Sequence, residues 1–238
     1  KYYCTESKLK RQAFPKNESE KVFDDMVTKK GDNSLLAVCH IDGNSMGKRI
    51  KRIMGGEGGE HKVIESYGEA IITMRKLSRE IADTFRHTFD EMTGYMDSLS
   101  AKIKKTQHKL YREIIVAGDD ITFVCNPKLA IPAVRYFLEN IGNHGEYSAC
   151  GGVAFFNSHF PFSDAYQVAE ECCGSAKKRA KQKENRGTDD EIGNFFDYQM
   201  CSNIRAADLS NYRDRQYRSD AGSFVARPYY VPAKNDPY

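Results

Sequence analysis

The sequence lacks any apolar run long enough to cross a membrane, and its first residues contain no signal-peptide core. It also has no internal repeat and no low-complexity tract. Seven cysteines occur among the 238 residues, but no two of them form a C-x2-C pair. An odd cysteine count without zinc or disulfide spacing favours reduced thiols, so we expect a cytoplasmic protein without a membrane partner.

A strong excess of one charge is also absent. The net charge is +3, from 36 Lys and Arg against 33 Asp and Glu, so the whole-chain balance barely favours a nucleic-acid partner. Hydrophobic residues at 40% and charged residues at 29% are typical of a globular protein. The length suffices for one large domain or two small ones. The chain opens on Lys1, which suggests a piece of a longer protein.

Apolar periodicity predicts the first elements. Residues 35–41 form a nearly continuous apolar run, which is typical of a strand buried on both faces. Apolar residues then recur at steps of three and four from Ile64 to Ile103, which predicts a helix of roughly eleven turns. We expect Thr93-Gly94 to bend or divide this helix.

The remaining pattern predicts an α+β fold. Two β-rich runs, 112–116 and 121–125, are joined through a Gly-Asp pair and predict a hairpin. We then expect a helix at 129–141, a strand at 147–156, a helix from 162 or 163 to 183, and a strand at 194–200. This order predicts a ferredoxin-like β-α-β-β-α-β unit, with a long helical insertion after the first strand and its helices on one face of an antiparallel sheet.

Three carboxylates are placed to converge at one end of that sheet. Asp42 follows the first strand, and Asp119 and Asp120 lie at the hairpin turn. Clustered carboxylates are unfavourable without a cation, and a pair of Mg²⁺ or Mn²⁺ ions would neutralise them. Two such ions can activate a hydroxyl and stabilise a leaving pyrophosphate. Gly-Asp-Asp is by itself common turn chemistry, so the pairing on adjoining strands carries the prediction.

Two motifs resemble one known family. Residues 41–48, Ile-Asp-Gly-Asn-Ser-Met-Gly-Lys, resemble the Asp-Gly-Asp-x-Met-Gly motif in the palm of the large polymerase/cyclase subunit of type III CRISPR effector complexes. Residues 116–120, Val-Ala-Gly-Asp-Asp, resemble the Gly-Gly-Asp-Asp hairpin of that family. Further similar segments lie at 150–155, 160–162, 165–178, 194–198 and 227–229, so the resemblance spans roughly residues 35–230.

The resemblance implies a palm related to that of GGDEF-type diguanylate cyclases, with ATP as substrate and a cyclic oligoadenylate messenger in antiviral defence as product. It implies Asp42, Asp119 and Asp120 as catalytic residues and metal ligands, with Ile41 in the metal set. The cofactors would be two Mg²⁺ or Mn²⁺ ions per site. We divide the chain into an N-terminal arm at 1–34, the palm at 35–200, and a C-terminal extension at 201–238 that packs on the palm.

Nucleotide contacts are expected around the first motif and on the later basic helix. Backbone N–H groups at 44–47 suit phosphate oxygens, and a lysine near Lys177 contacts phosphate in related cyclases. The predicted nucleotide-binding residues are Asn44, Ser45, Met46, Gly47, Lys48, Gly118, Lys177 and Arg186. A solvated basic helix end is the alternative for the lysines. Ser148 is a weaker candidate for contact with a base, and His40 is expected to pack beside the sheet.

Two departures from the family motifs keep a second function open. Asn44 stands where a second carboxylate is expected, and Ala117 replaces the first glycine of the hairpin motif. They favour the alternative of a weak or inactive palm that serves as a scaffold for RNA and protein subunits of an RNA-guided complex. A diguanylate cyclase is disfavoured, because Ile121-Thr122 stands where that class carries Glu-Phe. Catalysis would need two nucleotides, and therefore a homodimer or a second palm.

Overall fold

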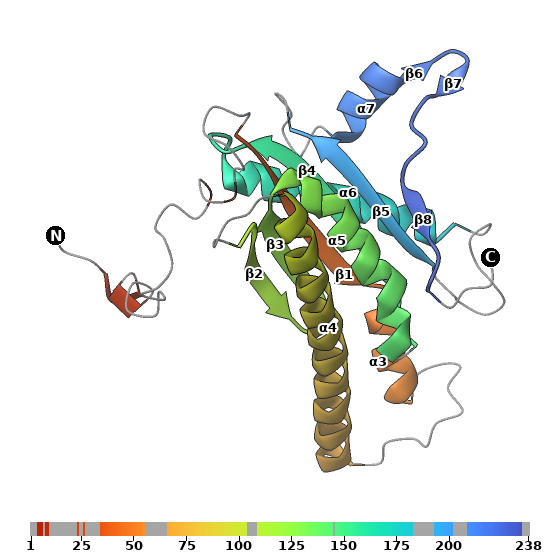
Figure 1. Cartoon of the computed structure of the whole chain (residues 1–238). Helices are drawn as coiled ribbons and strands as arrows, with labels where there is room; N and C mark the ends of the chain where they lie inside the picture. Colours follow the sequence, from red (N-terminus) through yellow and green to blue (C-terminus); the bar gives the residue numbers. More distant parts are fainter. Residues whose placement is uncertain are drawn as a thin grey trace.

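The structure is a computed structural model, and it includes the strands that carry the three predicted carboxylates. The described residues are 4–6, 8–9, 23, 26, 34–55, 66–103, 109–144, 146–182, 193–201 and 209–234. Among them lie one six-stranded sheet, one two-stranded sheet and five α-helices that belong to the body of the fold (Figure 1). The predicted α+β class is therefore confirmed.

The large sheet has the strand order β2-β3-β1-β4-β5-β8. Its strands are β1 (Leu35–Gly43), β2 (Tyr111–Ala117), β3 (Asp120–Cys125), β4 (Ala149–Asn157), β5 (Asn194–Met200) and β8 (Tyr229–Val231). The β4–β5 pair is parallel, and the other four pairs are antiparallel. β1 lies between β3 and β4 and is buried along most of its length, because both of its faces are covered.

Helices connect these strands and cover them. They are α3 (Met46–Ile53), α4 (Tyr67–Ile103), α5 (Pro127–Asn140), α6 (Phe162–Ala180) and α7 (Leu209–Tyr217). A 3-10 turn (Ile141–His144) follows α5, and a small hairpin of β6 (Arg218–Ser219) and β7 (Gly222–Ser223) follows α7. The hairpin of β2 and β3 and the strand β5 lie where the sequence predicts them, whereas α6 ends three residues earlier than predicted.

The long helix α4 is undivided, so the predicted break at Thr93-Gly94 is wrong. Gly94 is exposed, and the Thr93 hydroxyl donates a hydrogen bond to the carbonyl oxygen of Asp90 at 2.8 Å, within the helix. Met92 and Met96 are fully buried on either side of the glycine. Their packing holds both halves of the helix on one core, which outweighs the roughly 1 kcal/mol propensity penalty of one glycine.

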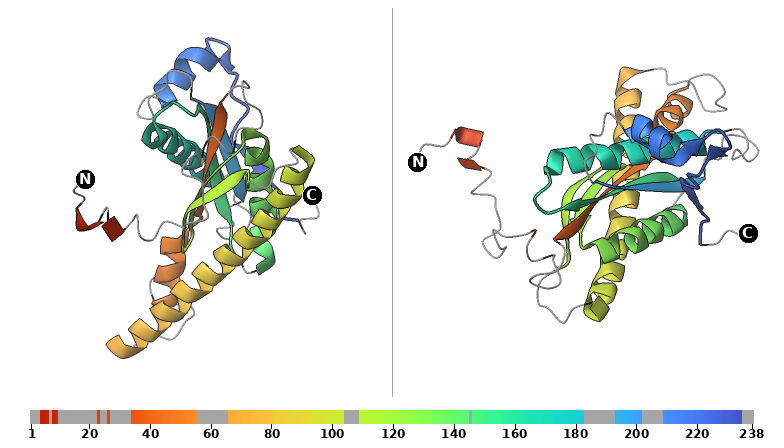
Figure 2. Two further views of the ribbon diagram at one scale, coloured as in Figure 1. Left: turned by 60° about the vertical axis from the view of Figure 1, so that its left-hand side comes forward. Right: turned by 90° about the horizontal axis from the view of Figure 1, so that it is seen from above.

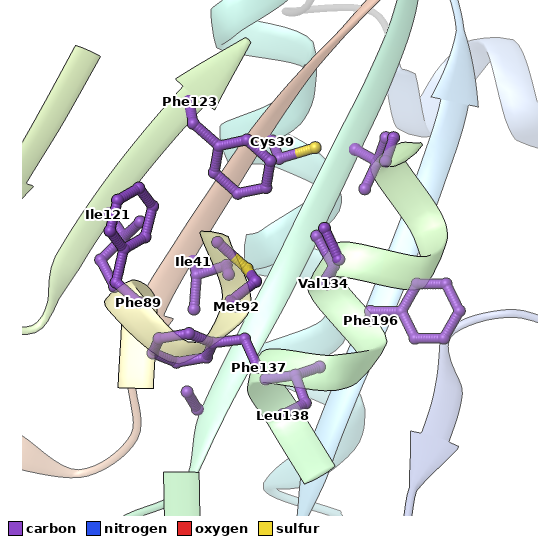
Figure 3. Packing of buried hydrophobic residues seen from close by; sticks show 14 of the residues in the cluster. Cys39, Ile41, Phe89, Met92, Ile121, Phe123, Val134, Phe137, Leu138 and Phe196 are labelled. Atoms are coloured by element: carbon purple, nitrogen blue, oxygen red, sulfur yellow. The ribbon is translucent and has the colours of Figure 1, made fainter. Parts of the chain in front are cut away.

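One face of the sheet packs against α4 and α5. Alternate residues of β1 and β3 point to this face and meet aromatic and aliphatic side chains of the two helices (Figure 3). The labelled members of this cluster are Cys39, Ile41, Phe89, Met92, Ile121, Phe123, Val134, Phe137, Leu138 and Phe196. The N-terminal part of α4 extends beyond the sheet, with α3 beside it (Figures 1 and 2). There Tyr67, predicted as part of the apolar stripe, is 83% exposed.

The opposite face of the sheet is covered by α6, which follows β4 in the chain (Figure 2). The two helices between β1 and β4 that were expected on one face, α4 and α5, both pack on the first face. Val38 of β1 and Ala154 of β4 point to this side and pack against small residues of α6. Gly152 lets the helix approach closely. A Cβ there would stand 1.9 Å from the Ala169 carbonyl oxygen and 2.4 Å from the Cys173 amide nitrogen. The parallel β4–β5 pair needs a crossover connection, and α6 is that connection.

The C-terminal segment is tied to β5 by a buried ion-pair network. The Asp197 side chain is 0% exposed and receives two hydrogen bonds from the Arg213 guanidinium, at 2.6 and 3.1 Å. Arg227 lies 3.5 Å from the same carboxylate, and it donates to the Gln199 side-chain oxygen at 3.0 Å. A buried carboxylate needs such compensation, so this network docks α7 and the segment before β8 on the sheet. No described helix combines the length and apolar character that a membrane crossing requires.

The cysteines give a direct test of this packing. Cys4 is exposed, whereas the other six thiols are buried and free. Burial raises the pKa of Cys150 to about 11 and that of Cys201 to about 12. Thiolates react and buried thiols do not, so we expect a thiol reagent such as DTNB to label Cys4 quickly in the native chain. All seven cysteines should react after unfolding in denaturant. Rapid labelling of several thiols without denaturant would contradict this core.

Candidate functional site

Asp42 and Asp120 face each other across two neighbouring strands. Asp42 lies near the end of β1, Asp120 begins β3, and the two residues are register partners in the antiparallel ladder. Side chains directly opposite each other share one face of the sheet, with Cβ atoms about 4.5–5.5 Å apart. Asp119 lies in the turn before β3, and its carbonyl oxygen accepts a hydrogen bond from the Gly43 N–H at 3.2 Å. The three carboxylates predicted from the sequence thus lie at one end of the sheet.

The tight turn that presents Asp119 depends on Gly118. Ala117 and Asp120 are register partners, so the turn consists of two residues, and Gly118 has a φ of 64°. Glycine adopts this left-handed conformation without the strain that a side chain would add. Ala117 is exposed, so its methyl group lies at the surface of the hairpin.

The environment of the turn works against two negative charges. Burial raises the pKa of Asp119, and the charge of Asp42 adds to this effect, while Lys177 opposes it. Burial likewise raises the pKa of Asp120, where His40 lowers it and Asp42 raises it. Partial burial and like charges both disfavour the ionised form. Ionisation of Asp119 and of Asp120 therefore carries a free-energy cost in the folded chain, which a bound cation would remove.

His40 contacts Asp120 on the α6 side of the sheet. Its Nδ1 lies 3.2 Å from the Thr122 hydroxyl oxygen and 3.4 Å from Oδ1 of Asp120. That Oδ1 is buried and has no hydrogen-bond partner among the described residues. The His40 ring also packs edge-on against Tyr166 of α6. The sequence analysis treated His40 only as a packing residue. Its spacing of two from Asp42 places both side chains on one face of β1, which is the signal that could have identified it.

Lys177 of α6 supplies a positive charge at Asp42. Its Nζ lies 2.5 Å from Oδ2 of Asp42 and donates a hydrogen bond to the Gly43 carbonyl oxygen at 3.0 Å. The Lys177 side chain is 23% exposed, so this ion pair is shielded from water more than a surface pair. Lys177 is one of the residues predicted from the sequence to contact a nucleotide phosphate. The structure shows that it first contacts a carboxylate.

Asn44 fixes the backbone between β1 and α3. Its backbone N–H donates to the Ser148 carbonyl oxygen at 2.9 Å, and its side-chain Nδ2 donates to the Ser148 hydroxyl at 3.1 Å and the Gly193 carbonyl at 3.4 Å. Ser45 adopts a left-handed conformation with a φ of 55° and serves as the N-cap residue of α3. Because Ser45 follows Asp42 by three residues, α3 starts close to the end of β1 that carries the carboxylate.

The other predicted residues lie at different depths around this end of the sheet. The Ile41 side chain is fully buried in the core on the α4–α5 side, so it is turned away from the carboxylates. Met46 packs against the same core, whereas Gly47 and Lys48 are exposed on the first turn of α3. Arg186 lies outside the described residues.

In the part of the chain that the structure describes, no group of three or more His, Cys, Asp or Glu side chains has the arrangement of a complete metal site. The donor set at the end of β1 and β3 still fits a divalent cation in its chemistry. Carboxylate oxygens are the ligands that Mg²⁺ and Mn²⁺ prefer, and the Asp120 Oδ1 is a buried acceptor in need of a partner.

No model of a known protein family matches the sequence, and no curated protein matches it either. Solved structures with a similar fold are found. A chain of a Csm1-Csm4 subcomplex in the type III-A CRISPR-Csm interference complex is 14% identical with a TM-score of 0.43 over 65% of this chain and 20% of that chain. A chain of a Csm1-Csm4 cassette in complex with cA4 is 14% identical with a TM-score of 0.44 over 65% of this chain. The match spans only about a fifth (21%) of that chain's length.

Two cyclase-type domains are also similar. The active GGEEF domain of a diguanylate cyclase from Vibrio cholerae is 14% identical, with a TM-score of 0.32 over 68% of this chain and 91% of that domain. An EAL/GGDEF domain protein from M. capsulatus is 13% identical, with a TM-score of 0.32 over 78% of this chain and 99% of that one. Type III CRISPR subunits and GGDEF domains are therefore among the solved structures that match this chain.

Proposed function

We propose that this chain is the palm domain of a metal-dependent nucleotidyltransferase that uses ATP to make cyclic oligonucleotide messengers in CRISPR-type antiviral defence. The palm would comprise residues 35–200, between an N-terminal arm at 1–34 and a C-terminal extension at 201–238. The strand order β2-β3-β1-β4, with α4 and α5 on one face, supports a ferredoxin-like framework for it. The two sequence motifs around Asp42 and Asp119 support the choice of reaction.

One observation carries the proposal. Asp42, Asp119 and Asp120 are brought together from two separate strands, and the Asp120 Oδ1 is buried without a hydrogen-bond partner. A fold that needed these residues only as turn formers would surround a buried carboxylate oxygen with hydrogen-bond donors, whereas this oxygen has only the His40 Nδ1 near it, at 3.4 Å. Cation binding explains why the oxygen is there.

Different residues of the chain would hold the metal ions, orient a carboxylate and bind the phosphates of ATP. When bound, two Mg²⁺ or Mn²⁺ ions supply charge neutralisation at the attacking hydroxyl and at the leaving pyrophosphate. Asp42, Asp119 and Asp120 would hold these ions by their carboxylate oxygens, and His40 would orient Asp120. The backbone N–H groups at the start of α3 suit the phosphates of ATP, because a helix N-terminus carries positive partial charge.

Binding of two nucleotides requires a partner. The carboxylates lie at one end of a single sheet, so the described part of one chain presents these three carboxylates as one cluster. A 3′-hydroxyl on a second nucleotide would be presented by a second copy of this chain or by another palm. The partners proposed are therefore nucleotides, a homodimer or second palm, and CRISPR complex subunits with their RNA.

A scaffold role is the second candidate, and Lys177 favours it. Its ammonium neutralises Asp42 without any metal, which a palm that had lost catalysis would need. Asn44 points the same way, because its Nδ2 is used to tie Ser148 and Gly193 together. In that role the domain would bind RNA and protein subunits of an RNA-guided complex and leave ATP unchanged.

The proposal is tested by incubating the chain with ATP and MnCl2 and separating the products by ion-exchange chromatography. We expect oligoadenylate products from the wild type and at least about a hundredfold less from Asp42→Ala, because charge neutralisation at the reacting phosphate is lost. Asp83→Ala, which removes an exposed carboxylate of α4, is the matched control and should keep full activity. Unchanged ATP, together with equal Mn²⁺ binding by wild type and Asp42→Ala, would favour the scaffold.

A further inference from the structure

The depth at which α6 lies on the sheet decides where the Lys177 ammonium can reach. Gly152 allows the helix backbone into contact with β4, and the Cys173 thiol then contacts the Cys150 carbonyl oxygen at 3.3 Å. Cys150 is the register partner of Asp42, so one turn further along α6 the next residue on that face stands over Asp42. That residue is Lys177.

The Lys177 ammonium is held at two points. It lies 2.5 Å from the Asp42 Oδ2 and 3.0 Å from the Gly43 carbonyl oxygen. Both acceptors belong to the end of β1, and the charges of Asp119 and Asp120 are also close enough for Lys177 to lower their pKa values. The side chain thus interacts with the whole carboxylate cluster, at the place where a cation is required.

We infer that Lys177 is a tethered counter-cation of the carboxylate cluster and competes with a divalent cation for Asp42. This inference rests on the proposed metal-dependent function and adds how that site is regulated. A divalent cation that takes Asp42 as a ligand must displace the ammonium, which weakens metal binding to the free chain. A polyphosphate that attracts the ammonium instead leaves Asp42 to the metal.

The competition couples the two ligands thermodynamically. Any ligand that draws Lys177 from Asp42 strengthens metal binding, and by linkage a bound metal strengthens the binding of that ligand by the same factor. Metal without nucleotide is bound weakly, and nucleotide without metal meets a lysine that is engaged elsewhere. The site therefore assembles only when both are present.

The first measurement is Mn²⁺ affinity in the absence of nucleotide, by calorimetry on the intact chain. We expect Lys177→Gln to bind Mn²⁺ up to about fivefold more tightly than the wild type, because about fivefold is the upper end for releasing a partly exposed ion pair. Lys177→Arg, which keeps the positive charge, should bind Mn²⁺ no more tightly than the wild type. Lys178→Gln removes the neighbouring charge on the exposed side of α6 and is the matched control, with unchanged affinity.

The second measurement follows the chemical reactivity of the Lys177 amine. Acetylation by an N-hydroxysuccinimide ester, followed by peptide mass spectrometry, should label Lys177 several-fold faster at saturating Mn²⁺, while Lys178 stays constant. Equal Mn²⁺ affinity of wild type and Lys177→Gln would overturn the inference and leave the proposed function standing, provided that Asp42→Asn loses binding. If neither wild type nor Lys177→Gln binds Mn²⁺ in the millimolar range, the inference and the metal basis of the proposed function both fail.

Discussion

Replacing Gly152 with alanine is expected to destabilise the chain by about 3 kcal/mol or more and to move Lys177 away from Asp42. The new Cβ would stand 1.9 Å from the Ala169 carbonyl oxygen and 2.4 Å from the Cys173 amide nitrogen. Both are backbone atoms of α6, so no side-chain rotation relieves the overlap and the helix itself must shift. Because α6 buries seven side chains, a shift disturbs one whole face of the sheet.

Gly174→Ala, on α6, is the matched control. A Cβ on Gly174 meets no atom within 4 Å, so the same substitution adds a methyl group without a clash. Alanine is the better helix former, and the variant should be more stable than the wild type by about 0.5–1 kcal/mol. Urea unfolding followed by circular dichroism measures both free energies. Equal unfolding midpoints for Gly152→Ala and Gly174→Ala would show that the α6 backbone does not contact β4 at Gly152.

Gly152→Ala also tests whether the packing of α6 on the sheet controls Mn²⁺ binding at the carboxylates. If α6 positions Lys177 as described, Gly152→Ala should change Mn²⁺ affinity in the same direction as Lys177→Gln, even at temperatures where the variant remains folded. Lys177→Gln itself leaves the α6 backbone in place, so its unfolding midpoint should stay near that of the wild type.

The positions of the strands and of the three carboxylates were predictable because they follow from apolar runs and turn residues that are close together in the sequence. The apolar run of β1 ends at Asp42, and the β-rich runs of the hairpin meet at Gly118-Asp119, so the two turns follow from period and turn chemistry alone. That Asp42 and Asp120 face each other then follows from pairing β1 with β3. Each step uses residues that are close in sequence or a single pairing of strands.

The face covered by α6 was not predictable from the same signals. The sequence of α6 carries small residues on its buried side, including Ala165, Ala169 and Ala176, which suit either face of a sheet. The close approach at Gly152 sets how deeply α6 lies on the sheet, and it is a contact between backbones that no apolar period encodes. The Lys177–Asp42 pair depends on that approach and was missed for the same reason.

The break expected in α4 failed for a related reason. Glycine weakens a helix locally, but the fate of a helix in a folded chain is set mainly by its packing. Met92 and Met96 are both buried in the same cluster, one on each side of Gly94, so the core keeps the two halves in line. The Asp120–His40 contact was likewise hidden, since it joins residues of two strands through their register.

Asp120→Asn is expected to be inactive and, without divalent cations, more stable than the wild type at neutral pH. Burial raises the pKa of Asp120, which means that the folded state disfavours its ionised form. The buried Oδ1 has no hydrogen-bond partner among the described residues and only the His40 ring nitrogen near it, at 3.4 Å, so removing the charge removes a cost that the fold compensates only in part. Loss of a metal-binding carboxylate should reduce nucleotidyl transfer by at least about a hundredfold. Such an opposition between stability and activity is typical of charged functional sites.

The contribution of Asp120 to folding stability decreases as the pH rises. Because the folded-state pKa of Asp120 is raised, the wild type loses stability as pH rises through that pKa, and it regains stability as pH falls toward the unfolded value near 3.9. The advantage of Asp120→Asn should therefore be full at pH 7 and shrink as the solution is acidified. Thermal unfolding in EDTA between pH 4 and 7 measures this difference, with Asp83→Asn as an exposed-carboxylate control that should show none of it.

Added Mn²⁺ should raise the midpoint of the wild type and leave that of Asp120→Asn nearly unchanged, because binding to the folded state alone stabilises it. A wild type that is more stable than Asp120→Asn at pH 7 in EDTA would mean that the carboxylate is already compensated within the fold, and the case for a cation at this end of the sheet would fall.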